Sequence, residues 1–232
     1  MMIVKRFLLL LVFLTSLHVT GQKIEDYCKS FIHQKAIYTA QKTQKGNKNT
    51  DTYDVNFYRL TLQVNPEVKY ISGSTTTHLT SKDTNLKILY FDLKNSMQVD
   101  SIRFRNGLLS SFQQIDNQIR IDLGDSLAMD ELDSIQIYYQ GTPNSGGLGT
   151  FVQNSYNGQD SILWTLSQPF GASAWWPCKN SLTDKADSIE INITTPVKNQ
   201  VASIGLLRSI DTLGINCLLY TSPSPRDGLL SR

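Results

Sequence analysis

Residues 58–64 of this chain read Tyr-Arg-Leu-Thr-Leu-Gln-Val. Apolar side chains occupy positions 58, 60, 62 and 64, and polar side chains stand between them. Because successive side chains of a β-strand point to opposite faces, this alternation predicts a strand with one buried face and one exposed face. Pro66 ends the pattern, since proline has no backbone N–H to give to a sheet.

Similar apolar patterns follow at short intervals. Strands are predicted at Thr75–Thr80, Leu86–Leu93, Ile102–Phe104, Ile119–Leu123, Ile135–Tyr139, Ile189–Ile193 and Val201–Leu207. Leu86–Leu93 is almost wholly apolar, which is typical of a central strand. Turns are expected at Asn106-Gly107, at Asp116-Asn117 and at Asp211–Asn216. Because almost no helical pattern separates these strands, the fold class is predicted to be all-β, an antiparallel β-sandwich.

The first 21 residues have the layout of a secretory signal peptide. Lys5 and Arg6 supply positive charge, Phe7–Leu14 is an unbroken apolar run, and the small residue Gly21 precedes the expected cut. A membrane anchor is the alternative, but the run is too short to span about 30 Å of hydrocarbon. We therefore expect an exported chain (periplasmic, cell-surface or secreted), with a short helix at 23–40 inside a segment, 22–50, that ends as a polar linker.

Composition points to an ordinary globular chain. Of the 232 residues, 40% are hydrophobic and 18% are charged, and the net charge is +2. This balance predicts no strong attraction to nucleic acid, and no later apolar run in the mature chain is long enough to span a membrane. The spacing of Cys28, Cys178 and Cys217 fits no metal site. Export would permit a Cys28–Cys178 disulfide, and a buried free thiol is the simpler expectation.

The last stretch departs from the strand pattern. Cys217–Arg232 has no periodicity and contains two Ser-Pro pairs. It resembles translated adapter or vector sequence, so residues 216–232 are expected to be a non-native tail. A native disordered tail is the alternative. The expected β-domain is then residues 51–215.

A search for catalytic motifs finds none. The three histidines, His18, His33 and His78, do not form His-Glu-x-x-His, and no Gly-x-Ser-x-Gly occurs. The Gly-rich stretch 142–150 lacks the lysine of a phosphate-binding loop. We therefore predict no catalytic residue, no metal and no other cofactor in this chain.

One block of sequence stands out by its composition. Residues 164–180 read Trp-Thr-Leu-Ser-Gln-Pro-Phe-Gly-Ala-Ser-Ala-Trp-Trp-Pro-Cys-Lys-Asn, and all three tryptophans of the chain lie in it. Paired aromatic residues beside glycine and proline predict a shaped, partly buried loop between strands. Such a loop can wall a pocket.

Three segments together resemble the N-terminal β-domain of M1-family zinc aminopeptidases (aminopeptidase N-like), closest to exported forms from Bacteroidetes-type bacteria. The segments are Tyr53–Leu60, Tyr70–Ser74 and Trp164–Pro196. The last is specific, and the resemblance covers roughly residues 51–210. It implies a saddle-like β-sandwich.

The resemblance also implies a role for one residue. In that family a Thr-Gln-x-Glu segment helps to hold the free α-amino group of the substrate, and a Phe-Pro-Cys-x-Asp segment follows ten residues later. Thr165–Gln168 and Trp176–Cys178 stand at these positions, so Gln168 is implied to bind the substrate amine. Leu166 and Asn180 depart from the family pattern. The alternative is that Gln168 is a loop amide bonded to nearby backbone.

Trp175 and Trp176 are expected to pack this domain against a neighbour or to wall the substrate pocket. The family's Gly-x-Met-Glu-Asn clamp and zinc site belong to the next domain, and neither motif occurs in this sequence.

The resemblance thus implies the N-terminal fragment of a zinc aminopeptidase that releases N-terminal residues from peptides. Zinc is expected only in the intact parent, and the partners would be its missing catalytic domain and peptide substrates. A stand-alone exported module that binds peptides or glycans, and a purely structural surface domain, are the alternatives.

Overall fold

The computed structural model of the chain describes residues 48–105, 107–109, 111–144, 150–156, 158, 160–168, 170–214 and 217–225. The expected signal peptide, the helix at 23–40, Cys28 and residues 226–232 lie outside the described residues. The chain divides into two compact units, residues 1–44 and 45–232. Every element below belongs to the second unit.

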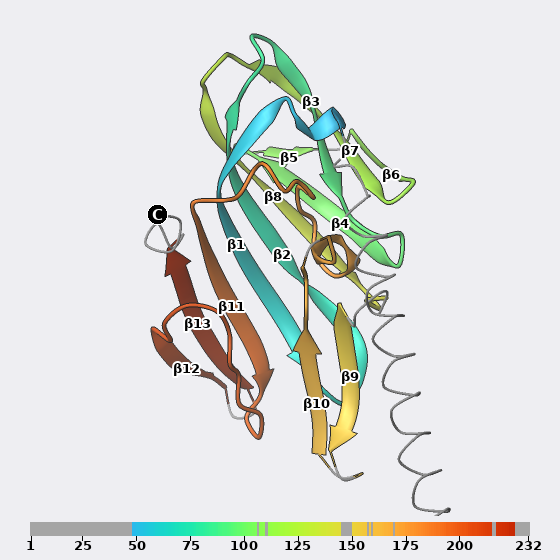
Figure 1. The fold of residues 1–232 in the computed structure, drawn as a ribbon, viewed down its shortest axis with the longest axis vertical. Coiled ribbons are helices and arrows are strands. Elements are labelled where there is room, and N and C mark those ends of the chain that lie inside the picture. Colours follow the sequence, from blue (N-terminus) through green and yellow to red (C-terminus); the bar gives the residue numbers. More distant parts are fainter. Residues whose placement is uncertain are drawn as a thin grey trace, which may run out of the picture. The chain divides into compact units, whose positions relative to one another are not determined.

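Eight strands form a large sheet in the spatial order β12-β13-β11-β1-β2-β8-β4-β5 (Figure 1). In that order they span Ser209–Leu213, Cys217–Pro225, Ser188–Pro196, Tyr53–Asn65, Val68–Ser81, Leu132–Gly141, Met97–Phe104 and Gly107–Leu109. All neighbours in this sheet are antiparallel except β1 and β11, which pair in parallel. A parallel partner needs a long crossover connection, and β11 follows the long segment 166–187.

Two smaller sheets complete the unit. A three-stranded sheet has the order β3-β7-β6, and β9 and β10 form a hairpin. These strands are β3 Leu86–Asp92, β6 Phe112–Ile115, β7 Gln118–Leu127, β9 Phe151–Tyr156 and β10 Asp160–Thr165. Two short 3-10 turns are η1 Lys48–Thr50 and η2 Ala172–Ala174. Among the described residues, no helix is long and apolar enough to cross a membrane.

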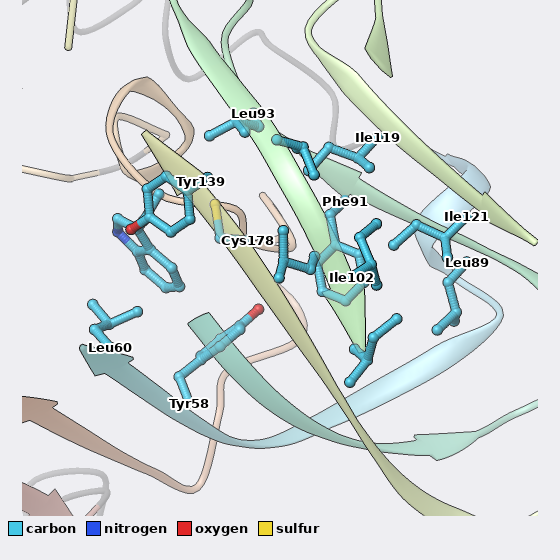
Figure 2. Close-up of a cluster of buried hydrophobic side chains, with 14 of the residues drawn as sticks. Tyr58, Leu60, Leu89, Phe91, Leu93, Ile102, Ile119, Ile121, Tyr139 and Cys178 are labelled. Carbon is cyan, nitrogen blue, oxygen red and sulfur yellow. The ribbon is translucent and has the colours of Figure 1, made fainter. Parts of the chain in front are cut away.

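One hydrophobic core lies between the large sheet and the three-stranded sheet. Leu60, Ile102 and Tyr139 of the large sheet and Phe91 and Ile119 of the small one are all buried in it (Figure 2). The period of two in residues 58–64 is confirmed, because positions 58, 60 and 62 are buried and positions 59, 61 and 63 are exposed. The predicted all-β sandwich is therefore confirmed.

The predicted hairpin turns were close to correct. At Asp116-Asn117 both residues have positive φ, 52° and 62°, as a type I′ turn requires, and Ile115 pairs with Gln118. The other turn lies one residue earlier than predicted, because Phe104 pairs with Gly107.

Several predicted elements were wrong. Leu86–Leu93 corresponds to β3, which is an edge strand rather than a central one. Its apolar residues are explained by the core, where the side chains of Leu86, Leu89, Phe91 and Leu93 are buried.

Val201–Leu207 is not a strand, although it is rich in apolar residues. Gly205 there has a φ of 86°, which interrupts an extended chain. Strand β13 takes the place beside β11, so this segment has no strand to pair with. It instead lines a small cavity of about 150 Å³ with Ile191 and Tyr220.

The region expected to be a turn and a tail contains strands. Residues 209–213 form β12, and residues 217–225 form β13, which pairs with both β11 and β12. Pro223 and Pro225 lie beyond the stretch that pairs with β12, so their missing N–H groups interrupt no ladder on that side. The origin of this segment stays a prediction.

Gly73 offers a test of how closely β1 and β2 approach. A Cβ at Gly73 would lie 2.0 Å from the Thr61 carbonyl oxygen, whereas a Cβ at Gly107 would have only the Phe104 oxygen near it, at 4.0 Å. We expect Gly73→Ala to lower the free energy of unfolding by about 3 kcal/mol, since backbone must move. Gly107→Ala should stay within about 1 kcal/mol of wild type. Urea denaturation of both variants checks this, and equal effects would contradict it.

Candidate functional site

The segment from Thr165 to Asp187 carries the predicted site residue. It leaves the end of β10, turns through η2 and crosses to the start of β11 (Figure 1). Backbone hydrogen bonds hold its first part: Leu166 N donates to Thr150 O at 3.3 Å, and Gly171 N donates to Ser167 O at 2.7 Å. The first bond ties the backbone before Gln168 to the rest of the domain, and the second closes a turn around Gln168 within the segment.

Gly171 shows how tightly this turn is packed. A Cβ at that position would lie 2.3 Å from Thr150 Cγ2 and 3.2 Å from the carbonyl oxygens of Leu166 and Ser167. Only glycine leaves room for this close approach. Gly171 is thus needed for the shape of the turn next to Gln168.

The side chain of Gln168 is exposed. Within the described part of the chain, its amide has no hydrogen-bond partner. Whether Gln168 binds a substrate amine or bonds nearby backbone stays a prediction. A held backbone and a free amide together leave one donor group and one acceptor available to a ligand.

Trp175 and Trp176 pack inside the domain that carries them, each only 8% exposed. Trp176 meets the ring of Tyr58 edge-on at 4.9 Å, and Trp175 lies 6.3 Å from the ring of Phe151. The Nε1–H of Trp175 donates to Ser167 Oγ at 3.1 Å, one residue before Gln168. What the structure shows for the two rings is thus a packing and anchoring role, and a role as pocket walls stays a prediction.

Trp164 is the tryptophan that faces solvent, with 45% of its surface exposed. Ile162 and Leu166 are exposed as well, at 43% and 41%. Their spacing of two places these three side chains on one face of β10 and its extension. No role was predicted for Trp164. The apolar residues at every second position, 162, 164 and 166, could have indicated a strand with an apolar face next to Gln168.

A buried ion pair ties the second part of the segment to β1. The Lys179 ammonium donates to the Asp184 carboxylate and to the Tyr53 carbonyl oxygen, and it lies 4.7 Å from the centre of the Tyr53 ring. The side chains of Lys179 and Asp184 are only 3% and 7% exposed. The Lys179 backbone N–H also donates to the Tyr58 hydroxyl at 3.0 Å.

A second buried carboxylate ties the segment to β3. Asp92 Oδ2 accepts from Asn180 N at 3.0 Å, and Asp92 Oδ1 accepts from Gln118 Nε2 at 3.2 Å. Asp92 and Cys178 exchange two backbone hydrogen bonds, of 2.8 and 3.1 Å. Burial raises the pKa of Asp92, although the bonds from Asn180 and Gln118 oppose that rise.

Asn180 replaces the aspartate of the family pattern and still makes specific contacts. Its Nδ2 donates to Ser173 Oγ at 2.8 Å and to Phe170 O at 3.4 Å. The amide therefore joins the end of the segment to η2, close to the turn that holds Gln168.

Cys178 is a free, buried cysteine. Its thiol lies in the core near Tyr139 and Ile102 (Figure 2), and burial raises its pKa well above the ordinary value. A thiol that stays protonated in an apolar setting is a structural residue rather than a nucleophile. The expectation of a buried free thiol is confirmed for Cys178, while Cys28 lies outside the described residues.

The described residues do not fit a metal site. No group of three or more His, Cys, Asp or Glu side chains among them lies close enough to hold a metal ion. His78 stacks edge-on against Phe57 at 5.0 Å, and burial together with Arg59 lowers its pKa. Its role is packing on the outer face of the large sheet.

The Lys179–Asp184 pair can be tested by a double-mutant cycle. Asp184→Asn leaves a buried ammonium without its counter-charge, and Lys179→Met leaves a buried carboxylate. We expect each single change to lower the free energy of unfolding by about 3–5 kcal/mol. The double variant should be more stable than either single variant, because no unpaired charge remains. Additive losses in urea denaturation would contradict a coupled pair.

The raised pKa of Asp92 predicts a dependence of stability on pH. The folded chain binds this carboxyl proton more tightly than the unfolded chain, so the stabilisation is full below the ordinary pKa of 3.8 and is lost as pH rises through the raised pKa. Relative to Asp92→Asn, the wild type should therefore lose stability over that window. Denaturant midpoints of both proteins across the pH series check this, and parallel curves would refute it.

Comparison with known proteins connects this geometry to a family. Residues 49–208, well over half of the chain, match the family model of the peptidase M1 N-terminal domain. A comparison with curated proteins found no match.

Solved structures give the same fold. An M1 zinc metallopeptidase from Deinococcus radiodurans has a TM-score of 0.65 at 22% identity, over 79% of this chain and 41% of that chain. A mutant of that enzyme bound to a Tyr-Ser-Ala substrate has a TM-score of 0.66 at 21% identity, over 78% and 41%. A two-domain M1 zinc metallopeptidase mutant bound to L-arginine has a TM-score of 0.65 at 23% identity, over 78% and 41%.

The chain thus spans about two-fifths of the length of these structural relatives. Since the family model covers most of the described β-sandwich, this chain belongs to the peptidase M1 family, in which it corresponds to the N-terminal domain.

Proposed function

We propose that this chain is the N-terminal part of a zinc-dependent metallo-aminopeptidase that releases N-terminal residues from peptides. Membership of the M1 family supports a metallo-aminopeptidase parent. The solved relatives support the peptide substrate, since their names record a bound Tyr-Ser-Ala substrate and bound L-arginine. The proposal places the cleavage chemistry in the part of the parent that this chain does not span.

Within that enzyme, Gln168 would hold the α-amino group of the substrate. The observation that carries this role is the exposed amide of Gln168, which has no hydrogen-bond partner among the described residues and lies in a turn closed by backbone hydrogen bonds. Its amide oxygen can accept a hydrogen bond from a substrate ammonium. A neutral amide lacks the full charge of a glutamate, so this bond should be weaker than a carboxylate would make.

Zinc would be held by residues beyond this chain. The described residues do not supply a ligand set, and the relatives extend well past the region that this chain matches. The exposed apolar face of Ile162, Trp164 and Leu166 lies next to Gln168 and is suited to contact the remaining part of the parent. Trp175 and Trp176 are buried, so they would not form this surface themselves.

The parent would act outside the cytoplasm. The positive charge at Lys5 and Arg6, followed by the apolar run Phe7–Leu14, supports export through a signal peptide.

The amine role is tested by variants of Gln168 in the intact parent, obtained by reading the gene beyond the codon for Asn216. Hydrogen bonds to charged groups contribute about 1.5–3 kcal/mol, so Gln168→Ala should lower kcat/KM for aminoacyl-arylamides by roughly tenfold or more. Gln168→Glu should retain the activity and lower KM, because it restores a charge-assisted bond. Gln113→Ala, an exposed glutamine on β6, is the matched control.

Two results would count against the proposal. If Gln168→Ala has the kcat/KM of Gln113→Ala, Gln168 does not bind the amine. If the purified 232-residue chain by itself hydrolyses aminoacyl-arylamides in a chelator-sensitive manner, the zinc site is not where we place it.

A further inference from the structure

A second cavity lies in the unit formed by residues 45–232, and its lining residues are all outside the Thr165–Asp187 segment. It is an open cavity of about 650 Å³ at the end of the large sheet where β2 and β4 begin and β8 ends. Its volume is in the range of small-molecule sites. We call it the polar groove, and its lining includes Lys69, Tyr70, Asn95, Ser96, Gln98, Gln140, Thr142 and Asn144.

Strand register explains why polar side chains gather there. Ser72 of β2 pairs with Gln140 of β8, which pairs with Gln98 of β4, so these three share one face of the sheet. The alternate residues Ile71 and Met97 are buried in the core. The groove therefore lies on the outer face of three adjacent strands, and Tyr70, Thr142 and Ser96 continue it one step further.

Several of its side chains are held in place by each other. The Tyr70 hydroxyl donates to Gln140 Oε1, and Gln140 Nε2 donates to Asp100 Oδ1 at 2.7 Å. Asn95 is held by a reciprocal pair of bonds with Asn117, each 3.1 Å. Such a network orders the groove before a ligand arrives, which lowers the entropy cost of binding.

Other polar groups are left available. The side chains of Ser96, Gln98 and Thr142 are exposed, and none of them has a hydrogen-bond partner within the described residues. Amides and hydroxyls both donate and accept. The ring of Tyr70 is 41% exposed beside them. A flat apolar ring next to paired donors and acceptors matches a sugar ring, which has an apolar face and hydroxyls at its rim.

Charge and backbone argue against other ligand classes. Among the described residues of the lining, Lys69 is the only charged one, and the nearby Asp100 already accepts a hydrogen bond from Gln140. These residues therefore form no cluster of charge that would select an anion or a cation. An extended peptide would need a free strand edge or apolar pockets. Strands β2 and β8 have a paired strand on each side, and at the edge of β4 that β5 does not cover, the Gln114 side chain already bonds Val99 N and Met97 O.

We propose that the polar groove binds a neutral glycan, with Tyr70 as the stacking platform and Ser96, Gln98 and Thr142 bonding the sugar hydroxyls. This inference does not depend on the aminopeptidase proposal, because it uses another surface. It adds a binding function by which the exported protein would attach to a polysaccharide.

The test is a titration of the full 232-residue chain with neutral hexasaccharides (cellohexaose, xylohexaose and chitohexaose), followed by isothermal calorimetry and by backbone amide NMR shifts. We expect saturable binding of at least one of them, with shift changes centred on residues 69–72, 95–98 and 140–144. Tyr70→Ala and Gln98→Ala should each weaken binding roughly tenfold, and Tyr70→Phe should retain most of it. Gln113→Ala is the matched control and should bind as wild type.

The inference is overturned if no hexasaccharide shifts groove residues, or if Tyr70→Ala binds as tightly as Gln113→Ala while circular dichroism shows both folded. Tighter binding of the anionic hexamer of polygalacturonate, or of a capped neutral peptide, would overturn it as well. These outcomes are separate from the Gln168 result, since activity on aminoacyl-arylamides is not measured.

Discussion

The buried ammonium of Lys179 holds the long crossover segment to the sandwich. Its bond to the Tyr53 carbonyl oxygen joins the segment to β1, which is distant in sequence, and its bond to Asp184 lies within the segment. Both charged side chains are almost fully removed from water there. Buried charges persist only when they are paired and hydrogen-bonded. The segment can therefore lie in one position against β1, which in turn sets where β11 begins its parallel pairing with β1.

Contacts at several points along the crossover segment hold it against the domain. They explain why some of its side chains are buried and others are exposed. The rings of Trp175 and Trp176, the Cys178 thiol and the Lys179 ammonium lie in the interior, whereas the Gln168 amide is exposed. A loop that is anchored by buried groups loses its backbone freedom on folding. An exposed side chain on it can therefore bind a ligand without a further entropy cost for ordering the backbone. This is the physical basis on which such a loop can contribute to a binding site.

Two different surfaces of one unit carry the two proposals. The Gln168 segment belongs to the core side of the large sheet, and the polar groove lies on the outer face, where every second residue of β2, β8 and β4 points. A sheet that is packed on one face leaves the other free to carry polar side chains in rows. The same alternation that builds the core thus builds the groove.

The sequence by itself determined where long, half-buried strands lie. At β1, β7 and β8 the alternation of apolar and polar residues predicts which side chains are buried, because this pattern can be read along a single strand. It failed at Val201–Leu207, because an apolar pattern does not say whether a partner strand is available, and β13 occupies that place. It also missed the short strands β5, β6 and β12, where too few residues alternate to produce a signal.

At the candidate site the division is similar. The aromatic block was visible from composition, and the family resemblance implied a role for Gln168 within it, because those residues stand close together in the chain. Only the tertiary structure decided that Trp175 and Trp176 face inward, that Trp164 faces solvent, and that Lys179 and Asp92 anchor the segment. The anchoring contacts of Lys179 and Asp92 are made with Tyr53, Tyr58 and Gln118. These partners are far away in the sequence, so the contacts form only when the chain folds.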